Sequence, residues 1–104
     1  MFTGQENHDV TLVDAKQMTK AFRDQASTGA VLGHFFGKKA LQKILDQEDC
    51  VGIRHYYGEN KSGEPVLVLV GVTANGADMT GGVILELGFP CPPKCFGSSP
   101  LAND

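Results

Sequence analysis

The sequence predicts an α+β fold in which two helices pack on a three-stranded antiparallel sheet. Three observations support this prediction: apolar residues recur at helical spacing before residue 46, the spacing becomes strand-like from Cys50, and turn residues divide the second half into three segments. With 104 residues, the chain has the length of one domain with a modest core. We assign residues 10–104 to this domain, with a flexible segment 1–9 and a Pro- and Cys-rich tail 89–104.

The first helix is expected from Leu12 to Gln25. Apolar side chains recur there every three or four residues, and Thr11 is a suitable N-cap residue with Asp14 three positions later. The second helix lies in the stretch GKKALQKILDQ, which also has one apolar face. Two starting points remain for it, near Ala30 or after Gly37, because glycine disfavours a helix interior.

Three strands are expected after the second helix. The stretch CVGIRHYYG, which begins at Cys50, is rich in β-branched and aromatic residues, and the turn sequence ENKSGE follows it. The second strand runs from Val66 to Thr73. The pair Asn75-Gly76 then favours a hairpin, and the third strand is expected from Val83 to Leu87.

The second strand is apolar on both faces, which a half-buried strand is not. Val66, Val68, Val70 and Val72 point to one face, and Leu67 and Leu69 point to the other. The two helices can cover one face. Either the tail folds back over the second face or another subunit covers it, and we favour the subunit because the tail has few apolar residues. These six residues are therefore the predicted interface of a homo-oligomer.

The three cysteines leave several interpretations open. Cys91 and Cys95 enclose two prolines, and with Cys50 they are the candidate ligands of a zinc or iron ion. In a three-stranded meander, however, Cys50 lies about 20 Å from Cys91, so a shared site needs a second subunit or a tail that doubles back. The pair can instead form a disulfide if the prolines turn, or it can pack as free thiols in a stiff tail, which is the interpretation we favour. In each case we expect Cys91 and Cys95 to lie close together and Cys50 to lie elsewhere.

No other motif predicts catalysis or a bound cofactor. The stretch IRHYYG contains Arg54, His55 and two tyrosines, but no nucleophile or second acid–base group stands beside them in the sequence. An exposed cross-strand pair explains these residues better. The glycines of TGAVLGHFFGKK do not form a phosphate-binding loop, since Gly33 and Gly37 are too close together and Lys39 stands where Ser or Thr is required. We assign no catalytic residue.

Composition and charge exclude some classes of partner. The net charge of −3 argues against nucleic acid, whose phosphates require a basic surface. No apolar run reaches the ~18 residues of a membrane span. The first residues, MFTGQENHDV, lack the features of a secretory signal, so we expect a cytoplasmic protein.

The stretches CVGIRHYYG, VLVLVGV and CPPKC resemble those of a group of small uncharacterised bacterial proteins associated with the Bacteroidota. The resemblance covers residues 37–96. It implies no activity, and it transfers no site residue to this chain.

Three classes of function therefore stand at this stage. The first, which we favour, is a non-catalytic, self-associating interaction or assembly module without a cofactor. The alternative is a thiol-based metal-binding or redox protein that uses Cys91, Cys95 and Cys50. The third is a small enzyme that uses Arg54, His55 or the tyrosines, for which the sequence offers no positive support.

Overall fold

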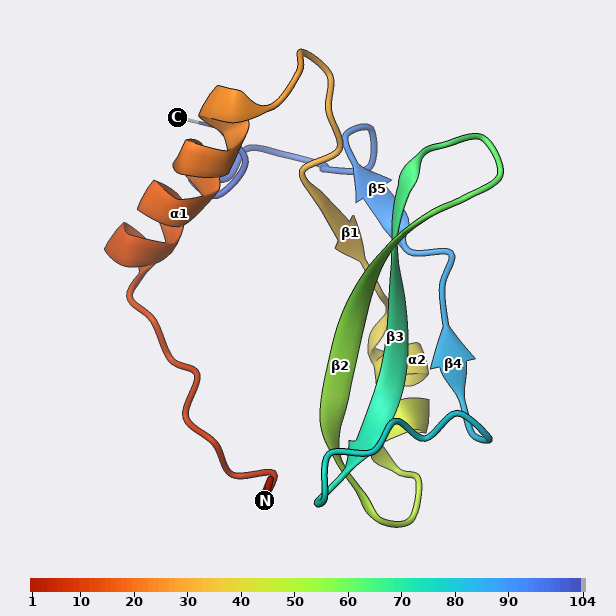
Figure 1. Ribbon diagram of the computed structural model, residues 1–104. Helices are drawn as coiled ribbons and strands as arrows, with labels where there is room; N and C mark the ends of the chain where they lie inside the picture. Colours follow the sequence, from red (N-terminus) through yellow and green to blue (C-terminus); the bar gives the residue numbers. More distant parts are fainter. Residues whose placement is uncertain (104) are drawn as a thin grey trace.

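The computed structural model describes residues 1–103 and confirms the α+β class, with two helices and two small antiparallel sheets (Figure 1). The larger sheet has the strand order β2-β3-β4, and the smaller sheet pairs β1 with β5. In chain order the elements are α1 (Leu12–Gln25), β1 (Gly33–Phe35), α2 (Lys38–Leu45), β2 (Cys50–Glu59), β3 (Pro65–Thr73), β4 (Ile84–Leu85) and β5 (Phe89–Cys91).

The starts of both helices follow from local chemistry. α1 has the predicted bounds, and the Thr11 hydroxyl accepts a hydrogen bond of 3.1 Å from the backbone N–H of Asp14, as an N-cap residue does. α2 begins directly after Gly37, which decides between its two predicted starts. The glycine therefore precedes the helix and does not weaken its interior.

β2 and β3 form the longest pairing of the molecule. Their register runs from Cys50 opposite Thr73 to Glu59 opposite Pro65, with one irregularity near the start of β2. The connecting turn is held by Asn60, whose side-chain oxygen accepts hydrogen bonds from the backbone N–H groups of Ser62 (2.9 Å) and Glu64 (3.0 Å). This hairpin matches the two adjacent strands that the sequence predicts.

The third predicted strand is shorter than its apolar sequence suggests. Only Ile84 and Leu85 pair with β3. The backbone N–H of Val83 instead donates to the side-chain oxygen of Gln47 at 2.8 Å, and Leu87 has a φ of 64°. A left-handed residue interrupts an extended strand, so the pairing ends before Leu87.

The pairing of β1 with β5 has no counterpart in the sequence-based prediction. Gly33 lies opposite Cys91 and Phe35 lies opposite Phe89. Each strand has three residues, and more than 50 residues of chain separate them. Strands this short carry no recognisable alternation, which is why sequence patterns missed them.

The buried apolar residues of the core are Ile44, Leu69, Val70 and Val72. Leu69 lies on one face of β3, and Val70 and Val72 lie on the other, which is the face of Arg54. Gly71 shares the face of Leu69, and a Cβ atom there would lie 2.9 Å from Nε2 of Gln47 and 3.1 Å from the sulfur of Cys50. The glycine thus allows the end of α2 to approach β3 closely.

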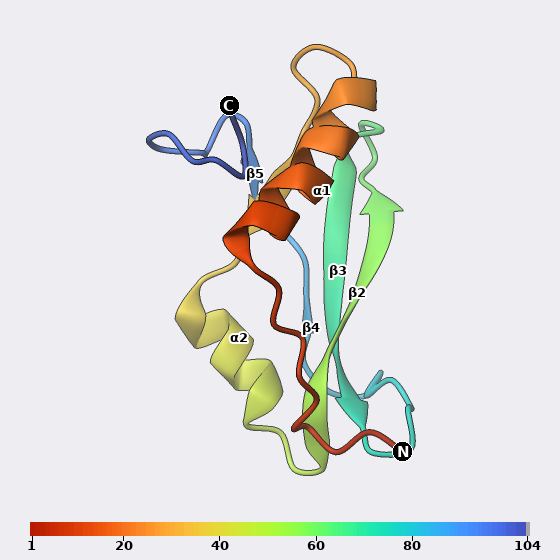
Figure 2. The same ribbon diagram turned by 90° about the vertical axis from the view of Figure 1, so that its left-hand side faces the viewer.

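The two helices contribute unequally to this core. α2 lies against one side of the sheet and buries Ile44, whereas α1 has no buried residue (Figure 2). In Figure 1, α1 stands beside the end of the sheet where β1 and β5 lie, and the chain that precedes it runs toward the opposite end. Packing against the three-stranded sheet therefore comes from α2.

Replacing Ile44 with Ala should lower the free energy of unfolding by about 2–5 kcal/mol, because the change leaves a cavity between α2 and the sheet. Leu45→Ala is the matched control, since the exposed Leu45 is the next residue of the same helix. That control should cost about 1 kcal/mol or less. Urea unfolding measures both, and equal losses would contradict the packing of α2 through Ile44.

Candidate functional site

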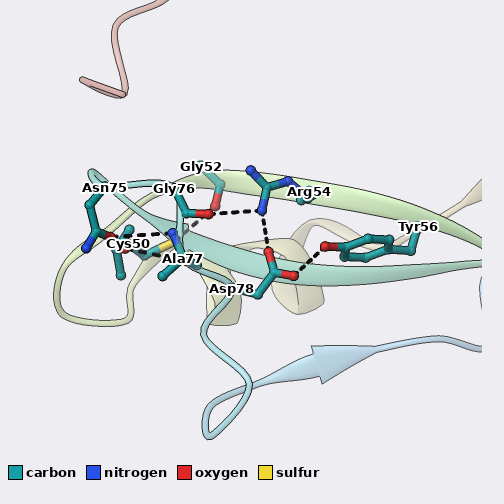
Figure 3. A network of polar contacts seen from close by, with 9 residues as sticks. Cys50, Gly52, Arg54, Tyr56, Asn75, Gly76, Ala77 and Asp78 are labelled. Atoms are coloured by element: carbon teal, nitrogen blue, oxygen red, sulfur yellow. Dashed lines mark hydrogen bonds and ion pairs between the residues drawn. The ribbon is translucent and has the colours of Figure 1, made fainter. Parts of the chain in front are cut away.

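Three charged or polar side chains meet on one face of the sheet. The Asp78 carboxylate accepts a hydrogen bond and ion pair from Nη1 of Arg54 at 2.5 Å and a hydrogen bond from the hydroxyl of Tyr56 at 2.5 Å (Figure 3). The same nitrogen of Arg54 donates to the carbonyl of Gly76 at 3.2 Å. These contacts join β2 to the turn after β3.

The turn after β3 places Asp78 in this cluster. Gly76 has a φ of 88°, which glycine adopts without strain, and the backbone N–H of Thr73 donates to the carbonyl of Ala77 at 3.0 Å. The chain therefore reverses, and Asp78 bridges to Val72 across the turn. Arg54 and Tyr56 stand on the same side of β2, so both reach the returning carboxylate.

Each group in the cluster stabilises the charged or protonated state of its neighbours. The hydrogen bond from Tyr56 lowers the pKa of Asp78, and Arg54 adds to this effect. The hydrogen bond to Asp78 raises the pKa of Tyr56, as does the negative charge of that carboxylate. The pKa of Arg54 is also raised, mainly by its hydrogen bond to Asp78.

These contacts favour a structural role for the cluster. The Asp78 carboxylate is ionised, the Tyr56 hydroxyl is protonated, and each is engaged by the other. Neither group is held ready to exchange a proton near neutral pH. The sequence predicted an exposed cross-strand pair for the residues of IRHYYG and did not place Asp78 beside them, whereas the structure joins Asp78 to Arg54 and Tyr56. The turn sequence Asn75-Gly76 could have indicated the position of Asp78, because a reversal of the chain there returns Asp78 toward β2.

An open groove of about 540 Å³ lies between the N-terminal segment and β2. Phe2, Gly4, Glu6 and His8 line one side of it, and residues 51–55 of β2 line the other. Phe2 fixes the start of the segment, because its backbone N–H donates to the carbonyl of Ala74 at 2.8 Å. Within residues 1–103, β2 pairs with β3 alone, so its other edge is free along this groove.

The structure separates the three cysteines. Cys91 and Cys95 form a disulfide, with their Cα atoms 4.7 Å apart, whereas the sulfur of the free Cys50 donates to the carbonyl of Gly52 at 3.2 Å. The expected proximity of Cys91 and Cys95 is confirmed. The favoured interpretation of two free, packed thiols is wrong, because the sulfurs are bonded and Cys95 is exposed.

A zinc or iron site at Cys50, Cys91 and Cys95 stays a prediction. Among the described residues, no group of three or more His, Cys, Asp or Glu side chains is placed so that it can hold a metal ion. Metal binding by these cysteines would therefore require reduction of the disulfide and a ligand from a second subunit.

The six residues of the predicted interface fall into two groups. Leu69, Val70 and Val72 are buried within the chain itself, so they offer almost no surface to a partner. Val66, Leu67 and Val68, at the hairpin end of β3, remain half-buried. Any contact through this strand is thus confined to its first half.

The half-buried part of β3 faces a set of exposed apolar side chains. Phe22 of α1 is 57% exposed and lines two clefts, of about 190 and 310 Å³. The smaller cleft includes Met18 and Leu101, and the larger includes Val66 and Leu67. Phe22 therefore lies at the centre of an apolar surface, which we call the α1 surface and define by Met18, Phe22, Leu32, Tyr57, Val66, Leu67 and Leu101.

A second apolar groove, of about 580 Å³, adjoins the disulfide. Phe35, Phe89 and Phe96 line it together with Lys94. The rings of Phe35 and Phe89 stack with their centroids 6.1 Å apart, and Nζ of Lys94 lies 5.9 Å from the centre of the Phe96 ring. This arrangement places three aromatic rings and one cation beside the sulfur atoms.

Comparison of the chain with protein-family models, with curated proteins and with solved structures finds no match. Within residues 1–103, no helix combines the length and the apolar character needed to cross a membrane. The cytoplasmic location stays a prediction.

Asp78→Asn tests the cluster through the pH dependence of stability. The folded-state pKa of Asp78 lies below its ordinary value of 3.8, so its stabilisation is present above that value and is lost as the pH falls through the folded-state pKa. The wild type should therefore be more stable than the variant at pH 5–7, and the difference should shrink in the acid range.

Urea unfolding between about pH 2.5 and pH 7 measures this difference. Asp9→Asn removes a carboxylate from the N-terminal segment and controls for the change in net charge. A difference between the wild type and Asp78→Asn that stays constant down to the lowest pH would contradict the proposed stabilisation by the ionised carboxylate.

Proposed function

We propose that this protein is a non-catalytic assembly module that functions as a homo-oligomer. The observation that carries the proposal is the surface of the isolated chain, which exposes 7796 Å². A folded monomer of 11.1 kDa exposes about 5,700 Å². The excess, roughly 2,100 Å², is surface that a stable monomer of this size normally buries.

The size of this excess is on the scale of a stable interface. If two copies each covered half of it, they would bury roughly 2,100 Å² together, within the range of obligate homodimers. The radius of gyration supports the same argument, because it is 15.3 Å, against about 13 Å for a compact domain of this length. A second copy is therefore the occupant we propose for the uncovered surface.

The α1 surface is the proposed site of contact. α1 buries no residue within its own chain, yet its apolar side carries Leu12, Met18 and Phe22, all more than half exposed. Propensity alone leaves a helix of 14 residues marginal in water, so burial of this side stabilises it. Phe22, between two clefts, has the character and position of a central anchor residue.

The tail of the chain is a poor alternative cover for this surface. Leu101 reaches the smaller cleft, and its carbonyl accepts a hydrogen bond of 2.9 Å from Arg23. Even with the tail in this position, Phe22 and Met18 remain more than half exposed. The apolar area that is left favours another subunit over the chain's own end.

The protein should sediment at twice its monomer mass of 11.1 kDa, or at a higher multiple, at micromolar concentration, because association buries the α1 surface. Sedimentation equilibrium between about 1 and 100 μM measures this mass. A compact monomer throughout that range would mean that α1 closes onto its own chain, which would overturn the proposal.

Phe22→Glu tests the site of contact. A charge at the centre of a desolvated apolar interface should raise the dissociation constant at least about 30-fold, the effect of an interface residue worth about 2 kcal/mol. The subunit should stay folded by far-UV circular dichroism, because Phe22 is not part of the core. Gln17→Glu adds the same charge to the same helix outside the α1 surface, and it should associate as the wild type does.

A further inference from the structure

The two sulfur atoms of the disulfide lie in unequal surroundings. Cys91 belongs to β5, and its carbonyl accepts a hydrogen bond of 2.6 Å from the backbone N–H of Leu32, next to β1. Cys95 follows the turn that closes with a 2.7 Å bond from the N–H of Lys94 to the carbonyl of Pro90, and it is exposed. One cysteine is therefore fixed in a sheet, and the other is accessible from solvent.

The disulfide contributes little that the strand pairing does not already provide. It closes a loop of only three intervening residues, and in the chain-entropy account the shortest loops gain the least stabilisation. β5 is held independently, because Gly33, His34 and Phe35 pair with it along its whole length. Breaking the S–S bond should thus leave the sheet in place.

The surroundings of Cys95 suit reversible exchange. Lys94 is its direct neighbour in the chain, and an adjacent ammonium group favours a thiolate over a thiol. A thiolate is both the attacking and the leaving species of thiol–disulfide exchange. Accessible disulfides are the labile ones, whereas buried structural disulfides resist reduction.

We propose that Cys91–Cys95 is a redox-active disulfide that accepts two electrons from a dithiol carried by a protein partner. This proposal does not depend on the assembly of the chain. The groove of about 580 Å³ beside the disulfide supports a protein partner, because Phe35, Phe89 and Phe96 offer it apolar contacts while Lys94 attracts its thiolate. Phe96 is 83% exposed and stands directly after the accessible cysteine.

The exchange proceeds in two balanced steps. A thiol of the partner loses its proton to solvent and attacks the sulfur of Cys95, and the S–S bond breaks with its electron pair on Cys91, which takes a proton. The second thiol of the partner then loses its proton and attacks the partner's own sulfur in the mixed disulfide. Cys95 leaves as a thiolate beside Lys94, so the protein ends as a dithiol and the partner as a disulfide.

The test uses the full chain with Cys50→Ser, so that the pair is the only source of thiols. Dithiothreitol at about millimolar concentration should reduce the pair in native buffer with no change in the far-UV spectrum, and glutathione disulfide should restore it. Mass spectrometry after alkylation counts the free thiols. If the pair resists reduction until urea unfolds the chain, or if reduction itself unfolds the chain, the disulfide is structural and the proposal fails.

Substitutions at Lys94 test the assigned site. Lys94→Gln should slow reduction by about threefold, and Lys94→Arg should restore the rate because it keeps the charge. Lys61→Gln, in the turn between β2 and β3, is the matched control and should not change it. Equal rates in all four proteins would overturn the role of Lys94.

The source of the dithiol is tested with a second probe, a synthetic peptide in which two cysteines are flanked by leucines. Phe96→Ser should slow reduction by the peptide several-fold and leave reduction by dithiothreitol unchanged, because the ring contacts a polypeptide and not a small thiol. Equal effects on the two probes would overturn the protein partner and leave a small-molecule dithiol as the reductant.

Discussion

The pairing of β2 with β3 is the interaction on which the rest of the structure depends. It supplies the only long run of hydrogen bonds between strands in the described chain, and it forms the surface against which α2 buries Ile44. It also sets Arg54 and Tyr56 at positions from which both reach Asp78. β4 has only two residues, and its place in the sheet depends on its pairing with β3.

This single hairpin is too small to bury all the apolar surface that the chain carries. The second half of β3, which includes Leu69 and Val70, is buried by α2 and the turn after β3. The first half, which begins near Val66, remains half-buried. α1 has no buried residue, and Leu12, Met18 and Phe22 on its apolar side are exposed. Because the uncovered apolar surface extends over several elements, we propose assembly and not a binding pocket for a small molecule.

The disulfide and the apolar surface concern different parts of the molecule. The α1 surface lies around Phe22, whereas the sulfur atoms and their aromatic groove lie on β5 and the exposed turn after it. Assembly depends on area and shape, while exchange depends on the accessibility of Cys95 and the charge of Lys94. The two proposals can therefore fail separately.

Elements whose signals are local could be predicted from the sequence. The N-cap at Thr11, the apolar stripe of α1, and the turns at Asn60 and Gly76 each depend on a few neighbouring residues, and the structure has them where the sequence predicts them. The proximity of Cys91 and Cys95 was also local, since three residues separate them.

Features that join distant segments could not be predicted from local sequence, because they depend on how the whole chain packs. The pairing of β1 with β5 depends on chain entropy and packing over more than 50 residues, and strands of three residues carry no periodic signal. Asp78 became part of a cluster only because the turn at Gly76 returned it to β2. Leu69 is buried and Val66 is only half-buried, although β3 is apolar along nearly its whole length. The elements that pack on β3 decide which of its residues are covered. No pattern within the strand itself indicates where those elements lie.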